Sequence, residues 1–319
     1  MIVTVTMNAA LDRILTVPNF QRGQRHLASE KLTLAGGKGI TVARALKRLG
    51  VPVVATGLAG GRNGRRILEE LTEEAILNDF VRIEDEARTS TAVVDPTSGE
   101  FTQVLDWGPL VQPAELEVLL EKIDYLSRGA SMVVFAGSLP RGMDDDFYAE
   151  AIRDLHRHGV LTVLDSEGEP LRLGLEAEPF LASPNQQEAE AVVGQEFLED
   201  GDFLDALDRL SDLGARNALI TYEHGCFASI RGERGQPRRY RAESPHLEAV
   251  SRVGSGAVLL AGFIAAWLED ATPEVVLRKA VAAGAASTLE VGAGRFDPRD
   301  VGRILPDVQV AELASVAGS

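Results

Sequence analysis

Short β-branched runs alternate with stretches of helical hydrophobic spacing along most of the chain. Strand-like runs cover residues 2–6, 51–60, 131–137 and 160–165. Stretches with helical spacing lie between these runs, and the first of them covers residues 40–50. Two more helices, about 256–269 and 273–289, are predicted near the end of the chain. This alternation predicts an α/β fold with a doubly wound, mostly parallel sheet and helices on both faces.

Two stretches depart from the alternation. Residues 12–35 and 80–107 are strand-like and contain no crossover helix, and PTSGE between TAVVD and FTQVL has the composition of a hairpin turn. We expect these stretches to form a small β-stranded lid on a single domain that spans residues 1–319. The exposed edges of such a lid make a homodimer through the lid a further hypothesis. The tail ELASVAGS is expected to fray.

Composition narrows the class of protein. The 319 residues carry a formal charge of −16, and an acidic chain is a poor candidate for binding nucleic acid or an anionic membrane. The N-terminus lacks the pattern of a leader, and no run reaches the roughly 18 apolar residues of a membrane span, so we expect a cytoplasmic protein. Cys226 is the only cysteine, which excludes an internal disulfide and a cysteine-rich metal site.

The stretch SRVGSGAVLLAGFIAAW, residues 251–267, places a glycine turn directly before an apolar helix. Free N–H groups and the positive end of the helix dipole make such a turn suitable for binding an anion. Gly254, Ser255 and Gly256 are the candidates for this site. An acid or base usually stands beside such a turn when it serves chemistry, but the next residue here is Ala257.

Other polar clusters follow predicted strands, where ligands bind in open parallel sheets. AGGKGITVAR places Lys38 in a glycine loop that matches neither a Walker A motif nor a dinucleotide fingerprint. Ser138 and Asp165 each follow a buried strand. Asn185 and Glu188 lie one helical turn apart, so they either order water around Mg²⁺ or cap a helix, and Lys38 is either a phosphate ligand or a solvated side chain.

Taken in order, these motifs resemble the ribokinase-like (PfkB) carbohydrate kinases, in particular the branch of 1-phosphofructokinases and tagatose-6-phosphate kinases. The resemblance covers nearly the whole chain. The motifs that carry it are TVTMNAALD, GGKGITVAR, GLAGGRNG, ARTS, WGP, GSLPRG, LDSEG, SPNQQE, VGSGAVLLAGF and AAGAASTLEVGAG. The resemblance implies transfer of the γ-phosphoryl group of ATP, with Mg²⁺, to a hydroxyl of a sugar or sugar phosphate such as fructose 1-phosphate.

The resemblance also implies a role for individual residues. Asp12, Gly36 and Gly37 would hold sugar hydroxyls, and Lys38, Arg88 and Ser138 would hold a phosphate already on the sugar. Asn185 and Glu188 would order Mg²⁺-bound water, and the Gly254–Ser255–Gly256 turn would form the anion hole over the transferred group. The nucleotide would lie against Gly225 and against the helix that contains Ala283 and Ser287.

The chain departs from the family pattern at several polar positions. Ala257 stands where the family has the aspartate that removes the proton from the attacking hydroxyl. The other departures are Leu27 (with Arg25 two residues earlier), Thr41, Ser90, Gln103, Leu105 and Ser183. Acids that could replace the missing base are Asp165, Glu167, Glu223 and the run from Asp144 to Asp146.

Three functions are consistent with these features. The first is a sugar or sugar-phosphate kinase whose activity is impaired by Ala257. The second is a degenerate kinase that binds nucleotide or phosphosugar in a regulatory role. The third is a kinase of another small alcohol such as a nucleoside, against which Lys38 and Arg88 argue because a neutral substrate would leave both charges uncompensated.

Overall fold

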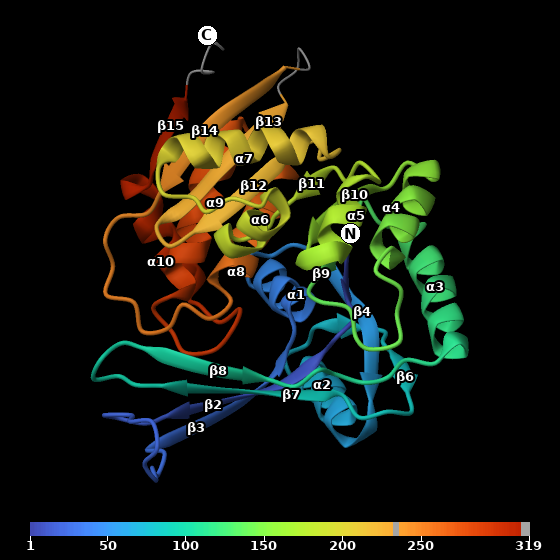
Figure 1. Cartoon of the computed structure of the whole chain (residues 1–319), viewed down its shortest axis with the longest axis vertical. Helices are drawn as coiled ribbons and strands as arrows, with labels where there is room; N and C mark the ends of the chain where they lie inside the picture. Colours follow the sequence, from blue (N-terminus) through green and yellow to red (C-terminus); the bar gives the residue numbers. More distant parts are fainter. Residues whose placement is uncertain (232–235, 314–319) are drawn as a thin grey trace.

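A computed structural model describes residues 1–231 and 236–313 and contains one large sheet (Figure 1). Eleven strands form this sheet. In spatial order they are β15 (Gln309–Leu313), β14 (Pro237–Glu243), β13 (Gly225–Arg231), β12 (Ala218–Tyr222), β11 (Leu181–Ala182), β10 (Leu161–Asp165), β9 (Met132–Ala136), β1 (Ile2–Thr6), β4 (Val53–Gly60) and β5 (Leu77–Asn78), with β6 (Val81–Ile83) beside β4.

The strands from β12 through β5 pair in parallel, and those from β12 to β15 pair antiparallel. The mostly parallel α/β sheet that the sequence predicts is therefore confirmed. The tail expectation is wrong for Glu312 and Leu313, because both lie in β15 and pair with β14. The remainder of that tail, residues 314–319, lies outside the described residues.

Helices cover both faces of the sheet, each face having its own hydrophobic core (Figure 1). Along β1, Ile2 belongs to one core and Val3 and Val5 to the other, as alternation in a strand requires. One face carries α1 (Lys38–Arg48), α2 (Gly61–Glu73), α8 (Ser255–Trp267), α9 (Pro273–Ser287) and α10 (Pro298–Ile304), the last followed by the short helix η1 (Leu305–Asp307). The other carries α3 (Pro113–Ser127), α4 (Phe147–Arg157), α5 (Gly168–Leu175), α6 (Gln186–Val193) and α7 (Asp200–Asp212).

A second, four-stranded sheet projects from the main body at the lower edge of Figure 1. Its strand order is β3 (Glu30–Gly36), β2 (Ala10–Thr16), β7 (Arg88–Val94) and β8 (Phe101–Leu105). We call it the lid sheet. The hairpin expected around PTSGE joins β7 to β8. The early part of the stretch 80–107 does not belong to it, because β6 pairs with β4 of the main sheet.

Helix α8 is apolar on nearly every side, and its position explains why. It packs between α1 and α9, and most of its residues from Ala257 to Ala266 are buried. A helix that is hydrophobic all round must be covered on all sides. Among the described residues, no helix combines the length and hydrophobicity needed to cross a bilayer.

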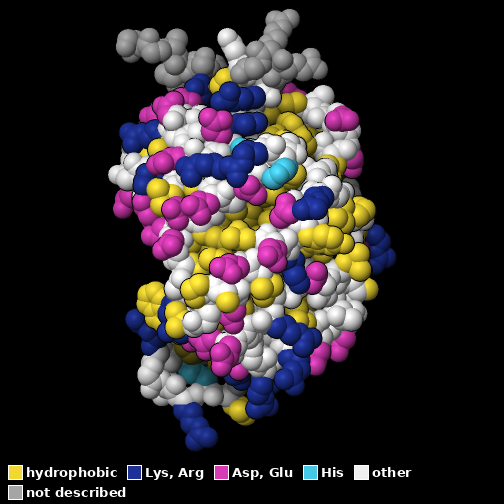
Figure 2. Space-filling view, turned by 90° about the vertical axis from the view of Figure 1, so that its right-hand side faces the viewer, with side chains coloured by type: hydrophobic (Ala, Val, Ile, Leu, Met, Phe, Trp, Pro, Cys, Tyr) yellow, Lys and Arg dark blue, Asp and Glu magenta, His cyan; other side chains and the backbone are white. Residues whose placement is uncertain are grey.

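The surface of the molecule carries charges of both signs. Figure 2 shows acidic and basic side chains side by side on the visible face, with hydrophobic side chains between them.

Arg44 of α1 is fully buried and joins α1 to β3, to the C-terminal part of α2 and to the loop at Ala293. Its Nε lies 2.7 Å from Glu74 Oε2, and its two Nη atoms donate to the carbonyl oxygens of Ala293 and Ala35, each at 2.9 Å. Both carboxylate oxygens of Glu70, which lies 3.9 Å from Arg44, are buried and accept no hydrogen bond from the described residues. The guanidinium therefore satisfies backbone carbonyls and offsets a buried charge at once.

We expect Arg44→Met to reduce the free energy of unfolding by about 3 kcal/mol, because it leaves buried carbonyl acceptors without their donor and Glu70 without a nearby counter-ion. Urea denaturation followed by circular dichroism measures the change. Arg128→Met is the control, since Arg128 is 72% exposed in a pair with Asp124, and should shift stability by less than about 0.5 kcal/mol. Equal losses in the two variants would contradict this role of Arg44.

Candidate active site

A cleft of about 1700 Å³ lies between the lid sheet and the carboxyl ends of the parallel strands. Asp12, Ser90 and Gln103 line it from the lid sheet, while Ala136 and Asp165 line it from the ends of β9 and β10. Polar groups from both sheets therefore face one volume. This position at the strand ends is where open α/β sheets bind their ligands.

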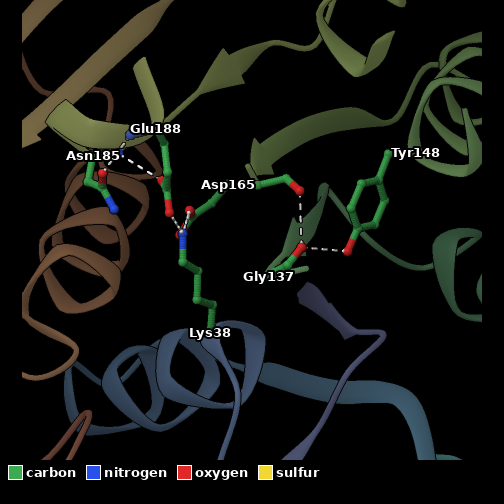
Figure 3. Close-up of polar contacts among 7 residues, drawn as sticks. Lys38, Gly137, Tyr148, Asp165, Asn185 and Glu188 are labelled. Carbon is green, nitrogen blue, oxygen red and sulfur yellow. Dashed lines mark hydrogen bonds and ion pairs between the residues drawn. The ribbon is translucent and has the colours of Figure 1, made fainter. Parts of the chain in front are cut away.

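Lys38, the first residue of α1, places its ammonium between two carboxylates (Figure 3). Lys38 Nζ lies 2.7 Å from Asp165 Oδ1 and 2.6 Å from Glu188 Oε1. Asp165 ends β10, and Glu188 belongs to the first turn of α6. Lys38 is therefore ion-paired and only partly exposed, at 35%, and it lines the cleft; the role that the family resemblance gives it, as a ligand for a phosphate on the sugar, stays a prediction.

Asn185 and Glu188 do form the helix cap that the sequence allowed. Asn185 Oδ1 accepts from the Glu188 N–H at 2.9 Å, and the Asn185 N–H donates to Glu188 Oε2 at 2.9 Å. The other carboxylate oxygen of Glu188 binds Lys38. The two interpretations of the pair are therefore compatible, because the cap fixes Glu188 while its second oxygen, which binds Lys38, lies at the cleft.

The charges in this cluster do not cancel. Burial alone would lower the pKa of Lys38, but the carboxylates of Asp165 and Glu188 raise it above its ordinary value. Burial also raises the pKa of Asp165, and Lys38 only partly opposes the effect. One ammonium serves two carboxylates, so the cluster holds one excess negative charge that a further cation can neutralise.

Asp12 of β2 faces the cleft from the lid sheet and is packed tightly over the glycine loop. A Cβ at Gly36 would lie 2.0 Å from Asp12 Oδ2, so only glycine fits there. Asp12 hydrogen-bonds Ser90, whose Oγ accepts from Gln103 Nε2 at 2.8 Å. Burial raises the pKa of Asp12 to about 6, although Arg88 and the Ser90 hydrogen bond lower it.

Asn8 is a polar residue of this region that the sequence reasoning did not select. Its Nδ2 donates to Ser138 Oγ at 3.3 Å and to the Trp107 carbonyl at 3.4 Å, and its backbone carbonyl accepts from Arg88 Nε at 3.2 Å. Asn8 Oδ1 is buried and has no partner among the described residues. The signal for it was its place directly after a buried strand, the same signal that selected Ser138.

The glycine turn, residues 254–257, begins α8 with free N–H groups. Gly254 has φ of 83°, a left-handed conformation that favours glycine, and the helix has no side-chain cap. In the described part of the chain, no hydrogen bond is recorded for the N–H groups of Gly256 and Ala257. Packing against Ala293 and Thr41 holds Gly254 in place. Ala257 lines the cleft and presents only a methyl group.

On the side expected for the nucleotide, the helix that contains Ala283 and Ser287 does line the cleft, but through other residues. Gly225 lines the cleft as expected, but Ala283 and Ser287 do not. Ala283 is fully buried against Gly262 of α8, and Ser287 Oγ donates to the Gly284 carbonyl. The residues of α9 that line the cleft share a neighbouring face of the helix, and the residue that follows the helix lines the cleft too. They are Val281, Gly284, Ala285 and Thr288.

Most of the other residues that the sequence selected reach the cleft. Gly37, Lys38, Arg88, Ser138, Asn185, Glu188 and the glycine turn all line it. Of the possible substitute acids, Asp165, Glu167 and Glu223 line it too, whereas the run from Asp144 to Asp146 does not.

A family model described as "pfkB family carbohydrate kinase" matches residues 3–299. The chain belongs to the PfkB family of carbohydrate kinases. It is 30% identical over 313 residues to a 1-phosphofructokinase of Borreliella burgdorferi, covering 98% of this chain and 99% of that protein. It is 28% identical over 317 residues to a tagatose-6-phosphate kinase of Staphylococcus epidermidis, covering 98% and 100%.

A solved structure supports the same assignment. Phosphofructokinase-2 from Escherichia coli, in complex with substrates and products, superposes with a TM-score of 0.87 at 26% identity, covering 96% of this chain and 98% of that one. The family resemblance and the ribokinase-like fold inferred from the sequence are therefore confirmed. By family, the chain is a carbohydrate kinase.

We expect Asp12→Asn to stabilise the protein at pH 7 by about 1–3 kcal/mol, because the raised pKa means that the folded state disfavours the ionised carboxylate. The folded state prefers the proton, so the stability contributed by Asp12 is full below pH 3.8 and is lost as the pH rises through about 6. The gain from the substitution should therefore be absent near pH 3.8. Thermal denaturation of both proteins across this range measures it, and a gain independent of pH would contradict the assignment.

Proposed function

We propose that this chain transfers the γ-phosphoryl group of ATP to a hydroxyl of a sugar phosphate, with fructose 1-phosphate or a similar ketohexose phosphate as the substrate class. The observation that carries the proposal is the single cleft that brings together the uncapped glycine turn, the Lys38 cluster and Asp12 with Arg88. Phosphoryl transfer depends mainly on positioning and charge neutralisation, and these groups supply both. The names of the relatives fit the same reaction.

Asp12 and the Gly36–Gly37 loop would hold the sugar hydroxyls. Arg88, with Ser138 and Asn8 beside it, would bind the phosphate that the sugar already carries. The guanidinium of Arg88 is partly buried, and its pKa is lowered by burial while Asp12 opposes the shift. A second anion is therefore favoured beside Arg88, and this argues against a neutral alcohol such as a nucleoside as substrate.

The residues around Lys38 fit a magnesium ion that arrives with nucleotide phosphates. Mg²⁺ commonly binds one or two carboxylates and completes its shell with phosphate oxygens and water. Glu188 and Asp165 offer such carboxylates, and Asn185 holds Glu188 in position. No group of three or more acidic, histidine or cysteine side chains forms a cage within the described residues. When bound, the metal would neutralise phosphate charge at this end of the cleft.

The glycine turn would stabilise the transferred phosphoryl group with the N–H groups of Gly256 and Ala257. Nothing at Ala257 accepts the proton of the attacking hydroxyl, since its side chain is a methyl group. Loss of a general base typically costs about 10²–10⁴ in rate. We therefore propose that this chain turns over slowly.

We expect Ala257→Asp to raise turnover by about 10²–10⁴, because it places a carboxylate beside the glycine turn. Release of ADP from MgATP is measured with fructose 1-phosphate, fructose 6-phosphate, tagatose 6-phosphate and fructose. Ala257→Asn is the control, since it has a similar shape and accepts no proton. Equal, rapid turnover by the original chain and Ala257→Asp would show that another acid serves as base. Turnover by neither protein with any sugar would contradict the proposed reaction.

A degenerate, ligand-binding role is the second candidate, and Ala257 is the observation that favours it. The pocket for the sugar phosphate and the cluster for the nucleotide do not depend on that side chain. Tight binding of MgATP or a phosphosugar, with no turnover even by Ala257→Asp, would support this role over the first.

We also propose a homodimer through the lid sheet. Strand β8 is its outer strand, so one edge of its backbone has no partner strand among the described residues, and hydrophobic side chains stand exposed on or beside it. These are Phe101, Val104, Leu105 and Trp107. An unpaired edge with apolar side chains favours pairing with another strand.

We expect Val104→Lys to convert this dimer to a monomer, because it places a desolvated charge in the interface. Sedimentation equilibrium at micromolar concentration measures the mass. Val118→Lys on α3 is the control, since Val118 is similarly apolar and exposed but distant in the fold. A monomeric original chain would contradict the dimer.

A further inference from the structure

Arg252 lies two residues before the glycine turn and lines the same cleft. Its Nη1 is 3.0 Å from Glu223 Oε1 and 3.3 Å from the Glu223 carbonyl oxygen. The side chains are 48% and 62% exposed, respectively. An ion pair this exposed contributes little net stability, so its two members exchange partners readily.

The cleft is strongly acidic, so each basic side chain in it, Arg252 included, matters for binding an anion. Among the described residues, eight carboxylate side chains line the cleft against three lysine or arginine side chains. The carboxylates are Asp12, Asp165, Glu167, Glu188, Glu190, Glu223, Glu243 and Asp307, and the basic side chains are Lys38, Arg88 and Arg252. A polyphosphate entering this volume meets net repulsion unless a positive charge approaches it.

Two of the three basic side chains already have their charge offset inside the fold. Lys38 lies between Asp165 and Glu188, both nearly buried. Arg88 lies beside Asp12 on the lid side. Arg252 is the basic cleft residue whose acidic partner is solvent-exposed, so it is the one that can turn to a new anion at small cost.

The position of the pair relative to the glycine turn supports this use. Glu223 directly follows β12, and a Cβ on Gly256 would lie 3.3 Å from Oγ1 of Thr221, a residue of that strand. The segment with Glu223 therefore lies directly against the glycine turn. Arg252 leads into the same turn, and its carbonyl accepts from the Ser255 N–H at 3.3 Å.

We propose that Arg252 is a phosphate-binding side chain. Glu223 holds it at the mouth of the glycine turn until the phosphates of the nucleotide replace Glu223 as its partner. The inference rests on the proposed function for the identity of the ligand, a nucleoside triphosphate. Glu223 competes with the ligand for the guanidinium and so weakens binding. Arginine matches phosphate geometry with two parallel hydrogen bonds, which a backbone turn alone lacks.

The test compares dissociation constants measured by isothermal titration calorimetry at low ionic strength. We expect Arg252→Gln to weaken MgATP binding at least tenfold, with a smaller loss for ADP and the smallest for AMP, because the lost charge faces phosphates. We expect Glu223→Gln to tighten MgATP binding about threefold, since it releases Arg252. In the double variant this tightening should disappear.

Asp307→Asn is the matched control for Glu223→Gln, because it removes another carboxylate of the cleft that forms no recorded ion pair with Arg252. Arg128→Gln, on the distant helix α3, is the control for lost positive charge. Equal tightening by Asp307→Asn and Glu223→Gln, or tightening that persists without Arg252, would overturn the competition. Unchanged affinity in Arg252→Gln would overturn the phosphate contact.

Inorganic tripolyphosphate, titrated in parallel, separates this inference from the proposed function. If the original chain binds tripolyphosphate and Arg252→Gln does not, the phosphate contact stands even where MgATP and sugar phosphates give no transfer. If the original chain binds neither tripolyphosphate nor MgATP, both the phosphate contact and the nucleotide-dependent function are excluded.

Discussion

The ammonium of Lys38 between Asp165 and Glu188 is the interaction on which the site depends. It joins the start of α1, the end of β10 and the first turn of α6, three segments that the sheet brings to one edge. Burying two carboxylates without a counterion would be prohibitive, so the lysine permits their burial. One ammonium neutralises only one of the two carboxylate charges, so the cluster can bind a further cation.

Elsewhere in the molecule, too, few charged side chains serve the buried polar groups. Arg44 donates to the carbonyl of Ala35 in β3 and to that of Ala293, in the loop on which Gly254 packs. The glycine turn itself carries no basic side chain and offers N–H dipoles instead. Asp12 lies in the cleft although burial raises its pKa to about 6. Keeping its carboxylate ionised there lowers the stability of the fold, as is common for residues that face a ligand.

At Ala257, the ability to bind an anion and the ability to accept a proton are separate properties of the turn. The turn around Ala257 has a left-handed glycine and free N–H groups, so the geometry suited to an anion does not need a carboxylate at this residue. A protein with this arrangement can bind a phosphorylated ligand and still lack a proton acceptor. The exposed pair of Arg252 and Glu223 adds a second level at which phosphate binding is tuned.

The sequence by itself determined the α/β fold, the family and most of the cleft, because hydrophobic periodicity and glycine motifs are local features that survive in order along the chain. It did not select Asn8 or Arg252, and it identified the helix of Ala283 and Ser287 but not the residues of that helix that line the cleft. Which side of α9 faces the ligand depends on how that helix packs against α8.

The partner of Lys38 also required the tertiary structure. Glycine-loop lysines in sequence look alike whether they meet phosphate, water or carboxylate. Only the parallel crossovers bring Asp165 and Glu188, 127 and 150 residues away, to within hydrogen-bonding distance of its ammonium. Charge pairing over such separations is set by the arrangement of the strands, and no local pattern encodes it.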